Sequence, residues 1–149
     1  MILLVHLLFG AVIGSKISNI YLAIILALLS HYLLDVIPHF DYPVKVKDRN
    51  QWKKLMLGAV KVALDFFTGI FLILIFSKNQ PTVYICAFFA LLPDGFTVLK
   101  YLIPGNKIFE AHYAFHMKLH FLKDKKISMF WRIFNQVAVV IISIILLKY

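Results

Sequence analysis

The sequence predicts an all-α membrane protein: a bundle of four transmembrane helices with a short N-terminal helix and an interfacial helix. The composition is 62% hydrophobic and 15% charged, with a mean hydropathy of +0.85. A soluble domain of 149 residues cannot bury that much apolar surface. The apolar runs also lack the ten-residue alternation of a membrane β-barrel, so the crossing segments should be helical. With no linker, low-complexity tract or repeat, residues 1–149 are expected to form one domain.

Five apolar segments divide the chain. The first, residues 2–13, is about a dozen residues long and suits a tilted, partly buried or half-spanning helix better than a full lipid-exposed span. No basic region precedes it and no small-residue cleavage site follows it, so it does not read as a signal peptide. The other four are long enough to cross a bilayer, at about 20 residues per crossing: 20–37, 55–76, 82–103 and 127–147.

The basic residues predict the orientation of these segments. If all five cross, Lys and Arg collect in two stretches on one side, 40–54 and 100–132, and only Lys16, Lys78 and Lys148 fall on the other. Because Lys and Arg prefer the cytoplasmic side, the N-terminus and both stretches should be cytoplasmic in a bacterial-type cell membrane. With a net charge of +9, this face could attract membrane lipid, including anionic phospholipid, or only orient the protein. No nucleic-acid motif is present.

Residues 31–41 carry two histidines and two carboxylates at the end of an apolar segment. Ionisable groups at membrane depth usually mark functional sites. His31 and Asp35 are four residues apart and project from one helix face, which is a metal-ligand geometry. The alternative is a helix–helix hydrogen bond. His39 and Asp41 follow Pro38, where the helix should end, and either join the site or mark the water interface.

The orientation predicted from the basic residues brings other ionisable groups to the same membrane face. His6 lies near the start of the first segment, as a ligand or an interfacial histidine. Asp94 belongs to a Pro-Asp-Gly break inside the fourth segment, which is tolerated only beside protein or a polar cavity. Asp65 follows Lys61 by one turn, so the two form either an ion pair or part of the site. A single polar pocket open to the cytoplasmic side accounts for all of them.

Three histidines, at positions 112, 116 and 120, form a stripe along a predicted interfacial helix. We expect His112 and His116 to bind metal. The alternative is a pH-sensitive helix on the membrane surface. The single Cys86 excludes disulfides and a cysteine-based zinc site.

Several of these motifs resemble a known family, the small membrane-bound metal-dependent hydrolases. The matching motifs are the His-Leu-Leu-Phe start at 6–9, the Ser-His-x-x-x-Asp motif at 30–35 with Pro38, and the Leu-Pro-Asp motif at 92–94. The family's His-Arg-Gly-x-Thr-His-Ser motif is absent and the motif order differs, so His112 and His116 would have to replace the missing ligands. The helical His-x-x-x-Asp pair is also similar to those of zinc-dependent phospholipases C. The resemblance implies hydrolysis and specifies no reaction.

We therefore predict a membrane-embedded hydrolase with one or two divalent metal ions, zinc first and manganese or iron otherwise, acting on a phosphoester or similar bond of a lipid-derived substrate. In this hypothesis Asp65 bridges the metals or acts as base, and His39 orients or ligates. Lys61 and Arg49 contact phosphate. The expected metal ligands are His6, His31, Asp35, Asp94, His112 and His116.

Two other functions use the same residues. A non-enzymatic metal-binding or proton-relaying protein needs polar groups reaching both membrane faces, yet the outer halves of the segments have few. A structural bundle would use them only for helix contacts.

Overall fold

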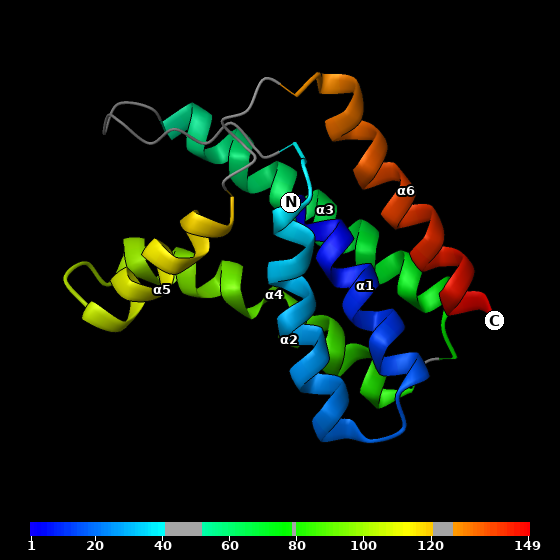
Figure 1. Cartoon of the computed structure of the whole chain (residues 1–149). Helices are drawn as coiled ribbons and strands as arrows, with labels where there is room; N and C mark the ends of the chain where they lie inside the picture. The colour runs from blue at the N-terminus through cyan, green and yellow to red at the C-terminus, as the bar shows by residue number, and fades with distance from the viewer. Residues whose placement is uncertain (41–51, 79, 121–126) are drawn as a thin grey trace.

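Six helices make up the regular structure in the computed structural model, which describes residues 1–40, 52–78, 80–120 and 127–149 (Figure 1). The predicted all-α class is confirmed for this part of the chain. In chain order the helices are α1 (Leu3–Lys16), α2 (Ile20–Val36), α3 (Trp52–Phe76), α4 (Pro81–Leu102), α5 (Lys107–Leu119) and α6 (Met129–Lys148).

Three helices, not the predicted four, are long and apolar enough to cross a membrane: Met56–Phe76 within α3, α4 and α6. The prediction for 20–37 was wrong because α2 has only 17 residues. The Asn19 side chain caps it by accepting hydrogen bonds from the amides of Tyr21 and Leu22, and Pro38 keeps Ile37 extended. At 1.5 Å per residue α2 is about 25 Å long, short of the ~30 Å hydrocarbon core. Three such helices are consistent with a membrane protein.

The short α1 is the central helix of the bundle. It packs against α2, α3, α4 and α6, which surround it in Figure 1. Residues on every side of α1 are buried, among them Leu7, Leu8, Ala11 and Val12. The expectation that this segment is buried rather than a lipid-exposed span is therefore confirmed.

Two glycines let α1 approach α4 closely. Gly10 and Gly14 lie one turn apart and face the α4 backbone. A Cβ at Gly10 would lie 2.6 Å from the Ala90 Cβ and 2.7 Å from the Cys86 carbonyl oxygen. A Cβ at Gly14 would lie 2.9 Å from the Cα of Val83 and overlap the Thr82 carbonyl. Small residues four apart are a common means of close helix packing in membranes, and here the pattern sets α1 antiparallel to α4.

One end of the bundle gathers the parts of the helices that carry the ionisable residues. The start of α1, the end of α2 and the second half of α4 meet there, and α5 packs on α4 and α2. The expected break at Pro93 does not occur, because α4 continues through it to Leu102. Pro93 still lacks an amide proton, so the helix loses one internal hydrogen bond at this depth. The turn into α5 uses Gly105 at φ +86° and the Asn106 cap.

The contact between α1 and α4 predicts different effects of the same substitution at two glycines. Gly10→Ala should destabilise the protein by about 1–3 kcal/mol because two backbones must separate. Gly95→Ala is the matched control, since a Cβ there meets nothing within 4 Å and the change should be neutral or stabilising. Thermal unfolding in mild detergent measures both variants. Equal shifts at the two positions would contradict the close approach.

Candidate metal centre

A buried carboxylate, Asp35, lies at the centre of a cluster of histidines. Asp35 is in the last turn of α2 and is 2% exposed. Its Oδ2 lies 2.7 Å from His116 Nε2 and 3.1 Å from His31 Nε2. Its Oδ1 faces the Met1 amino group at 2.6 Å, His6 Nε2 at 3.3 Å and His120 Nε2 at 3.8 Å. The predicted His31 and Asp35 pair therefore meets side chains from α1 and α5.

His31 is oriented by the backbone of α4. Its Nδ1 lies 2.8 Å from the Ala90 carbonyl oxygen. A carbonyl can only accept, so Nδ1 carries a proton, and Nε2 is the ring atom that faces Asp35. Ala90 lies one turn before Pro93 and Asp94 and is held close to α1 by Gly10. The turn of α4 that packs against Gly10 is therefore also the turn whose carbonyl accepts from His31.

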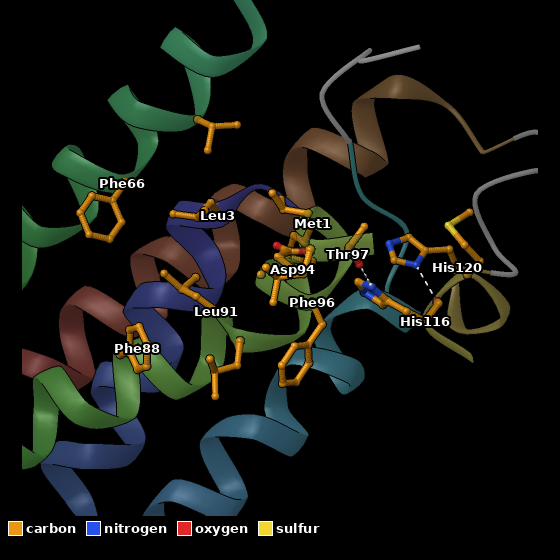
Figure 2. Close-up of a pocket in the computed structure, with 16 residues that line it drawn as sticks. Met1, Leu3, Phe66, Phe88, Leu91, Asp94, Phe96, Thr97, His116 and His120 are labelled. Carbon is orange, nitrogen blue, oxygen red and sulfur yellow. Dashed lines mark hydrogen bonds between the residues drawn. The ribbon is translucent and has the colours of Figure 1, made fainter. Parts of the chain in front are cut away.

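His116 on α5 has the same ring orientation as His31, but a side-chain hydroxyl rather than a backbone carbonyl fixes it. Thr97 Oγ1 donates to the Pro93 carbonyl oxygen at 3.2 Å, so its remaining contact, at 3.2 Å from His116 Nδ1, is as an acceptor. Thr97 joins His116 to α4 in Figure 2. His116 therefore carries its proton on Nδ1 and directs Nε2 at Asp35.

Two further histidines, His39 and His120, also donate Nδ1 to an oxygen of the protein. Nδ1 of His120 donates to the His116 carbonyl oxygen at 3.0 Å, and Nδ1 of His39 donates to that of Ile37 at 2.6 Å. The segment that holds His39 is tied to α6, because the Asn135 side chain donates to the Pro38 carbonyl. Metal-ligating histidines usually donate their other ring N–H in this way, which fixes the tautomer and ring orientation.

This arrangement places electron-rich atoms against one another. His31 Nε2 and His116 Nε2 are 3.3 Å apart, and both lie beside Asp35 Oδ2. With both Nδ1 atoms protonated, hydrogen bonds from both Nε2 atoms to Asp35 would require two imidazolium ions in contact at a buried position, which is costly. A divalent cation held by His31, Asp35 and His116 would accept both Nε2 lone pairs and a carboxylate oxygen.

His6 adds a buried ring with no other evident role. It stacks on His31 with 3.9 Å between ring centroids, and it is fully buried. Its nearest charged neighbour is Asp35, whose Oδ1 lies 3.3 Å from Nε2, and neither ring nitrogen makes a well-formed hydrogen bond among the described residues. A buried ring nitrogen needs a polar partner, and His6 is placed to share one with His31 and Asp94.

Three overlapping groups of side chains in the described structure could hold a metal ion. Within each group the ligand atoms lie within 4.8 Å of one another. Asp35 belongs to two of them and His31 to two. The groups are His6, His31 and Asp94; His31, Asp35 and His116; and Asp35, His39 and His120. Of the six predicted ligands, five are in these groups, as is His39.

The remaining predicted ligand, His112, lies outside these groups. Its Nε2 is 3.1 Å from the Tyr32 hydroxyl, on the side of His116 away from His120. Burial, together with the neighbouring His116 and His31, lowers the pKa of His112. His120, which we did not predict as a ligand, is in the cluster instead. The four-residue spacing of the stripe pointed to all three histidines and could not rank them.

The other predicted site residues have different positions. Asp65 accepts hydrogen bonds from the backbone amides of Leu3 and Leu4, so it caps the start of α1 from α3. Lys61, one turn earlier on α3, is exposed. Arg49 and Asp41 lie outside the described residues. Thr97 contacts His116 and Tyr32 contacts His112. The sequence did not predict either residue as part of the site, because hydroxyl side chains are common in helices.

Comparisons of the chain with protein families, curated proteins and solved structures return no match. The resemblance to membrane-bound metal-dependent hydrolases therefore stays a prediction. The geometry itself shows that the buried His and Asp groups could hold a metal ion.

The orientation of His116 predicts a difference between two substitutions of Thr97. Thr97→Val should destabilise the protein by about 1–3 kcal/mol, because the His116 N–H loses its buried acceptor. Thr97→Ser keeps the hydroxyl and should have a much smaller effect. Thermal unfolding of both variants in detergent checks this. A valine variant as stable as the serine variant would show that His116 does not depend on Thr97.

Proposed function

We propose that the protein is a membrane-embedded metal-dependent hydrolase that cleaves a phosphoester or similar bond of a lipid-derived substrate. The observation that carries the metal centre is the common orientation of four histidines. His31, His39, His116 and His120 each donate Nδ1 to a carbonyl or hydroxyl oxygen of the protein, and Nε2 of three of them lies within 4 Å of Asp35. A structural hydrogen-bond network has no need for so many rings with the same tautomer.

The sharing of Asp35 supports two ions rather than one. His31 and His116 lie on its Oδ2 side, while His120 lies on its Oδ1 side and forms a group with His39. His31, Asp35 and His116 would hold one ion, and Asp35, His39 and His120 would hold the second. Four imidazoles and one shared carboxylate favour zinc, with manganese and iron as the alternatives.

A divalent cation here would polarise a phosphoryl oxygen and lower the pKa of a bound water to about 7. Among the residues of the cluster, Asp94 is the carboxylate that also faces open space. Its side chain is 37% exposed, its Oδ1 lies 3.7 Å from His31 Nε2, and it lines the cavity beside the cluster (Figure 2). We assign Asp94 the role of the base that takes a proton from water at the edge of the centre.

The charged residues support a cytoplasmic position for this centre. Lys100, Lys107 and Lys118 lie near the end of α4 and on α5, beside the cluster. Lys16 and Lys148 lie at the C-terminal ends of α1 and α6, remote from it. By the positive-inside rule the basic end faces the cytoplasm, where anionic lipid headgroups are abundant.

The ligand assignment predicts which histidines hold metal. Protein purified without a His-tag should contain about two zinc ions per chain, measured by elemental mass spectrometry. Asp35→Ala should lose both ions and His120→Ala one, because each removes a ligand. His112→Ala is the matched control and should keep its metal. Absence of metal after reconstitution with zinc or manganese would overturn the centre, and equal losses at His112 and His120 would overturn the assignment.

The proposed role of Asp94 predicts a variant that keeps metal and loses activity. Asp94→Asn should retain the ions, since His31, His116, Asp35, His39 and His120 remain, and should slow hydrolysis of a soluble phosphodiester by about 10²–10⁴-fold. Chelation should abolish the wild-type activity. A metal-loaded wild-type protein that hydrolyses neither soluble nor lipid phosphoesters would overturn the hydrolase.

A further inference from the structure

A cavity of about 830 Å³ extends from the candidate metal centre into the apolar body of the bundle. Its polar groups are at one end, where Asp94, Thr97, His116 and His120 line it. Leu3, Phe66, Phe88 and Leu91 line the rest (Figure 2). In the view of Figure 2, Thr97, His116 and His120 are on the right, Asp94 and Phe96 are near the middle, and Phe66 and Phe88 are on the left. The cavity is therefore amphipathic along its length.

The cavity lies in a seam between two membrane-length helices. Although α3 and α4 are consecutive, their described residues do not pack on each other: α3 packs on α1 and α6, and α4 packs on α1, α2 and α5. Val62 and Phe66 line the seam from α3, and Phe88 lines it from α4. Both helices are long and apolar enough to cross a membrane, and these three residues lie within those spans.

The seam opens sideways, toward the lipid. Phe88 is 61% exposed and Phe66 39% exposed, although both line the cavity. At this depth the surroundings of a membrane helix are hydrocarbon, not water. A water-soluble substrate would gain nothing from an apolar channel that opens into lipid. A hydrocarbon chain can enter it from the bilayer without leaving an apolar environment.

From this geometry we propose that the seam between α3 and α4 holds an acyl chain of a membrane lipid, which enters laterally and places its anionic phosphate headgroup at the His/Asp centre. The inference rests on the proposed function for the identity of the headgroup site. Such a lipid has the same polarity pattern as the cavity. Its anionic phosphate suits the His/Asp centre when divalent metal is bound there, and its acyl chain suits the part lined by phenylalanines. Its size is also suitable, since ligand cavities of about 300–1,000 Å³ are typical.

The test uses the full, zinc-loaded protein in nanodiscs that contain phosphatidic acid with a photoactivatable diazirine in its acyl chain. Crosslinked peptides are mapped by mass spectrometry. We expect crosslinks concentrated at Val62, Phe66, Phe88 and Leu91, in excess over Leu64, which is on α3, is 62% exposed and does not line the cavity. Crosslinks spread evenly over the outward faces of α3 and α4 would overturn the proposal. This measurement needs no variant and no catalytic activity.

A pair of variants tests the same point through turnover. Val62→Trp should fill the seam and suppress hydrolysis of a long-chain lipid phosphoester, while hydrolysis of a soluble short-chain phosphoester and the zinc content stay unchanged. Leu64→Trp is the matched control and should leave both reactions unchanged. A Val62→Trp protein in which both substrates, or neither, are affected would contradict lateral entry. If no phosphoester is hydrolysed at all, the hydrolase fails while the crosslink map still decides the acyl-chain site.

Discussion

The interaction on which the site depends is the burial of one carboxylate, Asp35, among imidazole nitrogens inside an apolar bundle. A buried charge must be compensated, and here the compensation is supplied by residues from different helices. The Met1 amino group precedes α1, His6 comes from α1, His31 from α2, and His116 and His120 from the α5 segment. The two carboxylate oxygens of Asp35 thus link the packing of α1, α2 and α5. A cation bound beside them would stabilise the association of these helices.

The packing of α1 on α4 makes that convergence possible. Gly10 and Gly14 let the two backbones approach to a distance that any larger side chain would prevent. The turn of α4 packed against Gly10 carries the Ala90 carbonyl that meets His31, and Thr97 lies two turns later on α4, where it contacts His116. The same helix then presents Asp94 to the cavity. The helix that packs against the two glycines therefore also supplies the acceptors for His31 and His116. Such acceptors fix the tautomer of metal-ligating histidines.

Sequence reasoning succeeded where the information is local. Apolar segments located five of the six helices and the histidine stripe located α5, while the four-residue spacing of His31 and Asp35 correctly put them on one face. It failed where one or two residues decide the length or continuity of a helix. Residues 20–37 were counted as a span although Pro38 ends the helix at Val36. Pro93 suggested a break, but the surrounding helices keep α4 continuous. For Asp65 the sequence left an ion pair with Lys61 and a role in the chemistry both open, and the structure adds hydrogen bonds from the amides at the start of α1.

By itself the sequence determined the helical class, the apolar exterior, the gathering of ionisable residues toward one end and the residue types suited to a metal. These follow from composition and from the 3.6-residue period, which act within a segment. Only the tertiary structure decided that His120 rather than His112 joins the cluster, that α3 and α4 leave a seam between them, and which ring nitrogen of each histidine faces Asp35. Those outcomes depend on how α5 is rotated against α2 and α4 and on backbone carbonyls that belong to other helices. No spacing within a single segment encodes the relative rotation of two helices.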